Sequence, residues 1–396
     1  MSLLRSARFP AIVLLCAAAL GLIVANSPLG AAADDIMHAY VGIPDVFELS
    51  VDHWIKDGLL VLFFFVVAVE LQFELTNGQL NSAKKALQPA IAATGGVIVP
   101  IMVFFAFTAG TDSADGWPIP TATDIAFALG VLAVFGRGLP SALRIFLLAL
   151  AILDDIVGII FIAVLFTTDV NFGMLAAAAV CVVLFGVLSR QLDGRARIAI
   201  SIVLVLLAIA AWVFTYQSGV HATIAGVALG LAMAQQPALR TRHAMEPWVN
   251  GVVLPVFAFA AALVVIPQVP LRELTPAFWG IVVALPVGKI VGISLFGWIS
   301  LRVGRDKTAE KPALAFTDLL AAGALGGIGF TVSLLLSELA FASNDELRDE
   351  ATLGVLAGSM ISLLLAGILV SWRARHYRML DHVEAGTTAD DKSATA

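Results

Sequence analysis

The sequence predicts an all-α integral membrane protein that forms one domain over residues 1–378. Of its 396 residues, 60% are hydrophobic and only 13% are charged, and the mean hydropathy is +0.96. A soluble domain of ordinary composition has about 25% charged residues. Apolar runs of roughly 17–25 residues recur along the chain, which is the length that a helix needs to cross a bilayer. A membrane β-barrel would instead show segments of about ten residues with alternating polarity.

Twelve segments are expected to cross the membrane as helices. Their approximate ranges are 9–26, 57–76, 88–109, 118–136, 141–167, 172–189, 196–215, 219–235, 247–266, 276–300, 313–337 and 350–372. Most lysines and arginines fall at the N-terminus, in the even-numbered loops and in the C-terminal tail. Because cytoplasmic loops are enriched in these residues, the alternation predicts twelve helices with both termini in the cytoplasm.

Three regions outside the main spans carry their own predictions. The N-terminus has Arg5 and Arg8 before an apolar stretch, as a signal peptide does, but the stretch is about seventeen residues long and favours a retained first helix. Residues 31–56 contain strand-forming residues around a Pro-Asp turn and are expected to form a β-hairpin in the first outer loop. The polar residues 379–396 are expected to form a disordered cytoplasmic tail.

Residues 152–158 read ILDDIVG and place Asp154 and Asp155 in the middle of an apolar span. A charged side chain at the bilayer centre costs at least about 2.5–3.5 kcal/mol, so such residues are candidates for function. Two carboxylates about 4 Å apart repel each other by roughly 4 kcal/mol, which favours a proton on one of them until a cation binds. Because the same oxygens bind either H⁺ or a small hard cation such as Na⁺, this competition couples the two movements. The alternative is a hydrogen-bonded carboxyl pair with no role in transport.

Two spans are expected to be interrupted. In the fourth span, Pro118 and Pro120 stand shortly before Asp124, and proline removes a backbone donor and disfavours helix at the preceding residue. The eleventh span contains the sequence GALGGIGFTVS, whose glycines permit an unwound stretch. Irregular backbone at membrane depth is tolerated where it lines a cavity or is buried in protein. Close glycine packing between intact helices is the alternative for the eleventh span.

The tenth span contains Lys289 near its centre, and one of the two carboxylates is its expected partner. A lysine that extends to the membrane interface is the alternative. Spans 3–5 and spans 10–12 each have an interrupted helix second and begin on opposite sides of the membrane. This layout predicts inverted-topology repeats with a site near the midplane. The facing half-helix ends carry partial charges, which Asp124 and Lys289 are suited to offset.

Five stretches, in this order along the chain, resemble the NhaA family of sodium/proton antiporters: IPTATDIAFALGVLAVFG, LALAILDDIVGIIFIAVLFT, SGVHATIAGV, GKIVGISLFGW and GGIGFTVSLLLSELAF. The resemblance extends from about Arg8 to Arg375. It implies electrogenic export of Na⁺ or Li⁺ in exchange for two protons, by alternating access, across the inner (plasma) membrane. Sodium tolerance and pH homeostasis are the tasks that it implies. It also implies a homodimer held by the hairpin of the first outer loop.

The resemblance assigns roles to individual residues. The catalytic and crossing residues that match the family's motifs are Thr123, Asp124, Asp154, Asp155, Lys289 and Gly327. Asp155 is the expected Na⁺ or Li⁺ ligand, with Asp154 and Thr123 beside it, and Asp154 is the expected partner of Lys289. Thr123 and Asp124 are also the expected residues at the crossing of the interrupted helices, and Lys289 and Gly327 are expected there too. Weaker matches assign pH regulation to Glu70, Glu74, His221 and His243.

Several positions depart from the family's pattern and put its pH regulation in doubt for this chain. Gln72 and Phe73 stand between the two glutamates of the second span, where the family usually has basic residues. Arg242 stands where the family often has an acid. The other departures are Ala261, Ala262 and Leu263 in place of Asn-Ala-Gly, and Ile290 in place of a proline.

Three other functions are compatible with parts of this pattern. An intramembrane aspartyl protease also uses two buried carboxyl groups, but Lys289 would hold one of them ionised. A passive cation channel would move cations without protons. An organic-anion symporter would need more polar contacts for its substrate. Apart from the transported ions, no cofactor is expected, and the expected partners are membrane lipid and a second copy of the chain, with no nucleic acid.

Overall fold

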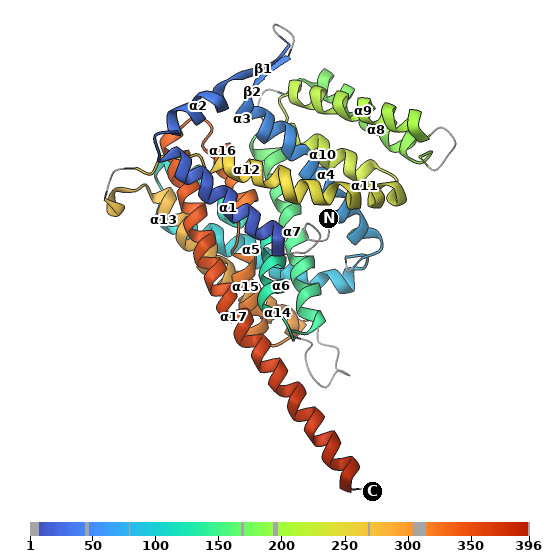
Figure 1. Cartoon of the computed structure of the whole chain (residues 1–396), viewed down its shortest axis with the longest axis vertical. Coiled ribbons are helices and arrows are strands. Elements are labelled where there is room, and N and C mark those ends of the chain that lie inside the picture. The colour runs from blue at the N-terminus through green and yellow to red at the C-terminus, as the bar shows by residue number, and fades with distance from the viewer. Residues whose placement is uncertain are drawn as a thin grey trace.

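Helices dominate the structure because every backbone polar group at membrane depth must be bonded within its own segment. The computed structural model describes residues 8–43, 47–78, 80–167, 170–192, 197–267, 270–303 and 314–394. Figure 1 shows a bundle of helices of varied tilt, with a small β-hairpin at one end and helix α17 extending beyond the other end.

The N-terminal part holds the hairpin and two long helices. Its elements are α1 (Arg8–Ala25), α2 (Gly30–His38), β1 (Tyr40–Ile43), β2 (Phe47–Ser50), α3 (Val51–His53), η2 (Trp54–Leu59) and α4 (Leu60–Thr76). Strands β1 and β2 pair antiparallel, with Tyr40 opposite Ser50 and Ile43 opposite Phe47. The expected hairpin is therefore present, although residues 30–38 of the same region form a helix and 44–46 lie outside the described residues. The π-helical segment η2 joins α3 and α4 into one continuous helix, Val51–Thr76.

The middle of the chain contains most of the irregular segments. Its elements are α5 (Ala83–Thr108), η3 (Asp112–Gly116), η4 (Ile119–Thr121), α6 (Ile125–Phe135), α7 (Ser141–Leu165), α8 (Phe172–Ser189), α9 (Arg197–Gln217), α10 (Thr223–Ala232), α11 (Gln235–Trp248), η5 (Val249–Val253) and α12 (Leu254–Ala261). Residues 122–124 between η4 and α6 have no helical structure. The two prolines of the fourth predicted span therefore replace the first half of a helix by a short 3₁₀ turn and an extended stretch.

The C-terminal part contains a second interrupted helix. Its elements are η6 (Leu271–Glu273), α13 (Pro276–Val283), η7 (Ala284–Gly288), α14 (Lys289–Val303), α15 (Phe316–Gly326), α16 (Phe330–Ala340) and α17 (Asp345–Ala394). The axes of α15 and α16 differ by 51° across a break of three residues, so the interruption predicted for the eleventh span is confirmed.

Twelve spans are not confirmed by the structure. Eight helices among the described residues are long and apolar enough to cross a membrane, and up to ten if each of two bent pairs counts as one span. Two predicted spans are shorter than the sequence suggested. Helix α6 has 11 residues because it begins only after the extended stretch, and α10 has 10 residues because it follows a turn at Gly219, whose φ is 80°.

The last helix, α17, includes most of the predicted tail. It continues to Ala394, and residues 395 and 396 lie outside the described residues. Disorder of residues 379–396 stays a prediction. No proline, which would interrupt the hydrogen-bond pattern of the helix, occurs between Asp345 and Ala394. Figure 1 shows this last part of α17 standing clear of the bundle.

The helices pack as two sets. The core set consists of α5, α6, α7 and α13 to α17, in which α14 packs along α5 and α17 packs along α13 and α15. The flanking set consists of α1, η2, α4 and α8 to α12, in which α4 packs along α10 and α1 along α12. The two sets touch where α1 meets α6 and where α12 meets α16.

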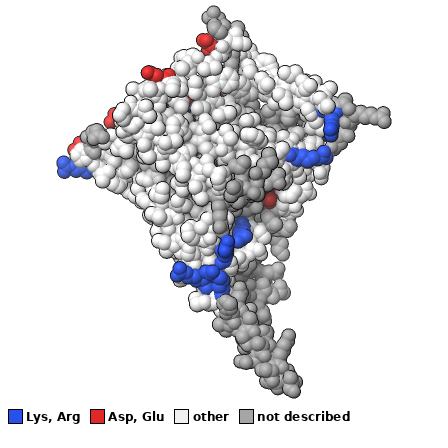
Figure 2. Space-filling model, in the orientation of Figure 1, with Lys and Arg blue, Asp and Glu red and all other residues white. Residues whose placement is uncertain are grey.

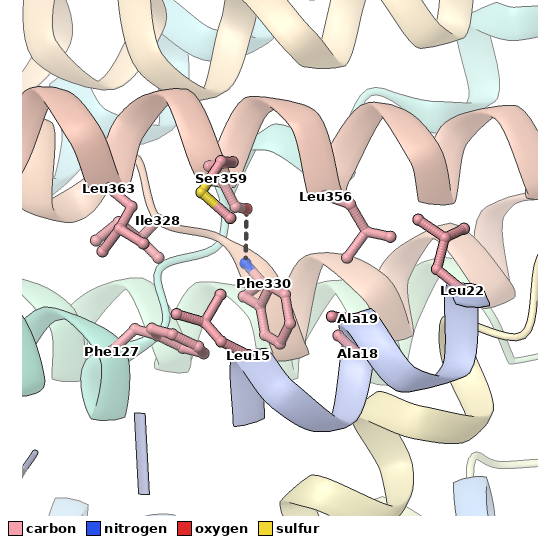
Figure 3. A pocket seen from close by; sticks show the side chains of 11 residues that line it. Leu15, Ala18, Ala19, Leu22, Phe127, Ile328, Phe330, Leu356, Ser359 and Leu363 are labelled. Atoms are coloured by element: carbon pink, nitrogen blue, oxygen red, sulfur yellow. Dashed lines mark hydrogen bonds between the residues drawn. The ribbon is translucent and has the colours of Figure 1, made fainter. Parts of the chain in front are cut away.

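An apolar cavity of about 170 Å³ lies between α1, α17 and the break in the eleventh span (Figure 3). Ile328, Phe330 and Phe127 line it from the core set, and Leu15 and Ala18 line it from α1. The hydroxyl oxygen of Ser359 accepts a hydrogen bond from the backbone N–H of Phe330, at 3.1 Å. Helix α17 thus satisfies one of the backbone donors that the break leaves without a helical partner.

Candidate functional site

Lys289 and Asp154 form a fully buried ion pair. The Nζ atom of Lys289 donates to Oδ2 of Asp154 at 2.6 Å, and both side chains are 0% exposed. Lys289 also donates to Oγ1 of Thr123, at 3.1 Å. The expected pairing of this lysine with one of the two carboxylates is therefore present, and the snorkelling alternative is wrong.

Glycines and an irregular turn position Lys289. It is the first residue of α14 and follows the π-helical segment η7. Helix α14 approaches α5 so closely that a side chain at Gly292 would meet the backbone of Gly95. A Cβ atom at Gly96 would lie 3.0 Å from the side chain of Ile293 in α14. The two glycines of α5 therefore let α14, which carries Lys289, pack closely against α5.

Thr123 connects the ion pair to the end of α15. Its Oγ1 lies 2.7 Å from Oδ2 of Asp154 and 2.8 Å from the carbonyl oxygen of Gly326. A hydroxyl has one proton, so Thr123 donates to one of these oxygens at a time. Among the described residues, Lys289 donates to no half-helix carbonyl directly, and Thr123 connects it to the C-terminal end of α15.

Asp124 lies where the two interrupted segments cross. Its backbone N–H donates to the carbonyl of Ile328 at 2.6 Å. Its Oδ1 accepts from the N–H of Phe127 at 3.1 Å, and its Oδ2 accepts from the N–H and the hydroxyl of Thr331 at 3.2 and 2.6 Å. One carboxylate thus caps the N-termini of α6 and α16, where the partial positive charge of a helix stabilises an anion.

Gly327 allows the break in the eleventh span to pack closely. A Cβ atom at this position would lie 2.6 Å from the carbonyl oxygen of Leu285 and 2.7 Å from the hydroxyl of Ser362. Any side chain would force the break between α15 and α16 away from η7 and α17. Gly327, which was predicted at the crossing, is therefore needed because no side chain fits between the break, η7 and α17.

Asp155 faces away from the ion pair and lines a cavity of about 160 Å³. Adjacent residues of a helix point about 100° apart, so Asp154 turns to Lys289 while Asp155 turns to the cavity. Asp155 is 8% exposed. The other polar residues that line this cavity are Glu70, Thr123, Asp124, Arg242, Glu246, Asn250 and Thr331. The cavity lies between the helix sets, because Glu70 and Arg242 belong to the flanking set and Asp155 to the core set.

The oxygen atoms at this site suit a small hard cation. The Oδ1 atom of Asp154 is buried and has no hydrogen-bond partner among the described residues, and Thr123, Asp124 and Asp155 line the cavity. Carboxylate and hydroxyl oxygens are ligands that hard cations prefer. No group of three or more His, Cys, Asp or Glu side chains in the described part of the chain is arranged to hold a metal ion.

The four residues assigned to pH regulation do not gather at one place. Glu70 pairs with Arg242 and lines the cavity. His221 lies 3.3 Å from Asp57 in η2, close to the hairpin. The other two are Glu74, which is buried, and His243, whose Nδ1 lies 2.6 Å from the carbonyl oxygen of Leu239.

Sequence reasoning missed several contacts around the site. Arg242 was noted as a departure but not as the partner of Glu70, and Glu246 was not noted, although it stands one helical turn from Arg242 on α11. The structure also contains a buried pair between Asp318 and Arg373, at 2.8 Å, which ties the start of α15 to α17. Arg373 directly follows the last predicted span, 350–372, and basic residues are common at the cytoplasmic ends of spans.

Comparisons with known proteins agree with this architecture. A sequence model of the family described as Na+/H+ antiporter 1 matches residues 1–370. A protein of Clavibacter michiganensis subsp. michiganensis named Na(+)/H(+) antiporter NhaA 2 is 54% identical over 398 residues, which cover 100% of this chain and 96% of that protein. Proteins named Na(+)/H(+) antiporter NhaA are 46% identical in Tropheryma whipplei, over 93% of this chain and 95% of theirs, and 40% identical in Thermobifida fusca, over 96% and 95%. The chain is therefore a multi-pass membrane protein that belongs to the Na+/H+ antiporter 1 family.

Proposed function

We propose that this protein exchanges Na⁺ or Li⁺ for protons at Asp155, with Asp154 and Lys289 beside it. The observation that carries the proposal is the division of the aspartate pair. Asp155 faces a cavity between two sets of helices, while its neighbour is held by a buried lysine. The names of the relatives, which are transporters rather than enzymes, support the same function.

Competition for oxygen atoms couples the two ions in this proposal. A cation that enters the cavity displaces a proton from Asp155, because the same carboxylate oxygens cannot hold both. Its charge also weakens the attraction between Asp154 and Lys289, since Asp154 then has a second positive partner. Release of a second proton from the lysine gives two protons for each cation. The exchange moves net charge, so a membrane potential contributes about 2.3 kcal/mol per charge per 100 mV.

Alternating access requires the cavity to open on each side of the membrane in turn. The core set carries Thr123, Asp124, Asp155 and Lys289, and the cavity lies where this set meets the flanking set. In the proposal, the core set moves as a rigid body against the flanking set, and the two interrupted segments that cross at Asp124 move together with it. The order of spans 3–5 and 10–12 supports inverted repeats as the basis of this movement.

The charge distribution supports an orientation with both termini in the cytoplasm of the cell and the hairpin outside, in the inner membrane. Figure 2 shows acidic side chains along the end that carries the hairpin and α2, and basic side chains beside the lower part of α17 and near α8 and α9. Lysine and arginine are enriched on the cytoplasmic side of membrane proteins. Sodium export in this orientation serves salt tolerance and pH homeostasis.

The hairpin supports a proposed homodimer. Strand β1 is exposed along its whole length, including Tyr40, Val41 and Ile43, which are 73%, 53% and 65% exposed. A strand with unpaired backbone groups and apolar side chains is a template for pairing with another chain. A second copy of this chain offers the same edge, which gives a symmetric contact.

The test follows a pH-sensitive dye in everted membrane vesicles from a host without its own antiporters. Respiration acidifies the vesicles, and NaCl, LiCl or KCl is then added. We expect Na⁺ and Li⁺, but not K⁺, to dissipate the gradient in the wild type and not in Asp155→Asn. Replacement of an exposed acid, Asp112→Asn, is the matched control and keeps the response. A correctly inserted wild-type protein that gives no response at any pH would falsify the proposal.

A measurement of ²²Na⁺ uptake beside the dye signal tests one rival function, and the hydrogen bonds of Asp124 speak against another. A passive channel would carry Na⁺ without any movement of protons, so the dye would not respond while ²²Na⁺ still entered. An intramembrane protease would need a second carboxyl group opposite Asp155, and Asp124, which lines the same cavity, is a candidate. Both oxygens of Asp124 accept hydrogen bonds at helix N-termini, which speaks against a catalytic role in hydrolysis.

A further inference from the structure

An ion cluster joins the two helix sets at the hairpin end of the molecule. The Nζ atom of Lys56 in η2 lies 2.7 Å from Oε2 of Glu338 in α16 and 2.9 Å from Oδ2 of Asp52. Arg348 of α17 adds a second cation, 3.7 Å from the same oxygen of Glu338. The side chains of Lys56 and Glu338 are only 18% and 12% exposed. The pair is therefore well shielded, although each residue stands near the end of its helix.

The Lys56–Glu338 pair crosses the boundary along which the cavity lies. Lys56 belongs to the flanking set, and Glu338 belongs to the core set. The next residue, Asp57, is held within the flanking set, because its carbonyl oxygen accepts from Nε1 of Trp212 at 2.8 Å and its carboxylate lies 3.3 Å from His221. The segment η2 thus stays anchored to its own set while Lys56 reaches across to the other.

The pair lies on the hairpin side of the cavity. Lys56 precedes Glu70 by fourteen residues of one continuous helix, a rise of about 21 Å. Glu338 follows Thr331 by seven residues of α16, a rise of about 10 Å. Glu70 and Thr331 both line the cavity next to Asp155. The ion pair therefore joins the two sets on the hairpin side of the cavity, at some distance from the residues that line it.

The chemistry of the pair suits a contact that breaks and forms again. A partly buried ion pair with two cations around one carboxylate holds its partners in a defined geometry. When the two sets separate and water enters, each charged group is hydrated, so the opened state carries no buried unpaired charge. An apolar seal of the same size would expose hydrophobic surface instead.

We propose that the Lys56–Glu338 pair is a latch that keeps the hairpin side of the cavity closed and breaks each time that side opens. The proposal rests on the proposed function, because only a transporter with alternating access needs this side to open. It concerns residues that take no part in binding Na⁺ or H⁺.

The first experiment fixes the latch with a covalent link. Cys16 and Cys181 are replaced by alanine, and Lys56→Cys/Glu338→Cys is treated with a bifunctional methanethiosulfonate. We expect the link to stop Na⁺-dependent proton movement in vesicles and a reductant to restore it. The control is Asp345→Cys/Asp349→Cys, which links two residues one turn apart on α17 within one set, leaves Lys56, Glu338 and Arg348 in place, and leaves the exchange unchanged. Exchange at the unlinked rate, with the link verified by mass, would overturn the latch.

The second experiment does not need transport, so it separates failure of the latch from failure of the proposed function. Leu335 is 2% exposed and shares a helix face with Thr331 and Glu338. Leu335→Cys is introduced into the chain that has alanine at positions 16 and 181. In intact cells, the rate at which an impermeant thiol reagent labels this cysteine reports how often the hairpin side of the boundary opens. We expect Glu338→Gln and Lys56→Met each to raise the labelling rate about fivefold, the equivalent of about 1 kcal/mol.

The combined variant and a control make this result decisive. Lys56→Met with Glu338→Gln should label at the rate of the single variants, because both changes break one contact. Asp345→Asn, at the 82% exposed end of the same cluster, should label at the parental rate. Equal labelling rates in the parent, both single variants and the double variant would overturn the proposal even if the vesicles exchange Na⁺ for protons. Vesicles that do not exchange would overturn the function, whatever the labelling shows.

Discussion

Asp154 and Asp155 are consecutive in the chain, yet only Asp154 contacts Lys289, at 2.6 Å, while Asp155 lines the cavity. The 100° step of the helix separates the two carboxyl groups into a fixed and an accessible one. This division predicts different consequences for the two acids. A change at Asp154 should affect the stability of the protein, and a change at Asp155 should affect cation binding.

Replacing the accessible acid should remove function without removing the fold. Asp155→Asn keeps the shape of the side chain and removes the charge that a cation needs, so we expect loss of Na⁺- and Li⁺-dependent proton movement. The melting temperature of the purified protein should stay the same or rise slightly, since a desolvated carboxylate is removed from the interior. A marked fall in melting temperature together with the loss of activity would show that Asp155 has a structural role instead.

Replacing one member of the fixed pair should destabilise the protein. Lys289→Met leaves Asp154 charged and without its cation in a fully buried place, and breaking such a pair costs about 3–5 kcal/mol. The double variant Lys289→Met/Asp154→Asn should recover most of that loss, because no unpaired charge remains. Thermal unfolding in detergent measures the melting temperatures of the single and the double variant. Equal melting temperatures for the single and double variants would contradict the interpretation of this pair as an ion pair.

The crossing of the interrupted helices should depend on the carboxylate of Asp124. Asp124→Ala removes the caps of α6 and α16 at once, and each cap is worth about 0.5–2 kcal/mol. Thr331→Val removes only the 2.6 Å hydroxyl bond and should cost about 1 kcal/mol. Hydrogen exchange measured by mass spectrometry should show faster exchange at residues 125–128 and 330–333 in the first variant. Unchanged exchange there would mean that other donors hold the crossing.

Competition between protons and cations predicts a specific pH dependence. As the pH falls, protons occupy Asp155 more of the time, so a higher Na⁺ concentration is needed to displace them. We expect the KM for Na⁺ to rise with falling pH while the maximal rate at saturating Na⁺ changes little. Dye assays over a matrix of pH and Na⁺ concentration measure this. A maximal rate that falls with pH at a constant KM would indicate a separate regulatory protonation.

The sequence alone identified the centre of the site but not its surroundings. Lys289, Asp154 and Asp124 stand out because a charge in the middle of an apolar span is costly and therefore rare. Lys56 and Glu338 do not stand out, since charges near helix ends are common, and 282 residues separate the two partners. Helix lengths were overestimated at α6 and α10 because hydropathy does not distinguish a helix from an extended apolar segment. The π-helical segments η2 and η7, which set the direction of Lys56 and Lys289, have no signature in composition.

Arg242 should weaken the binding of cations in the cavity. It is a positive charge in the lining of the space that Asp155 faces, and it neutralises Glu70. Arg242→Gln removes that charge and leaves Glu70 free to attract cations, so we expect the KM for Na⁺ to fall about fivefold, the equivalent of about 1 kcal/mol. The double variant Glu70→Gln/Arg242→Gln restores the net charge of the cavity and should return the KM close to that of the wild type. The neutral replacement of an arginine remote from the cavity, Arg197→Gln, is the control. If the single and double variants share one KM, the cavity charge does not govern cation binding, and the Glu70–Arg242 pair serves to hold α4 against α11.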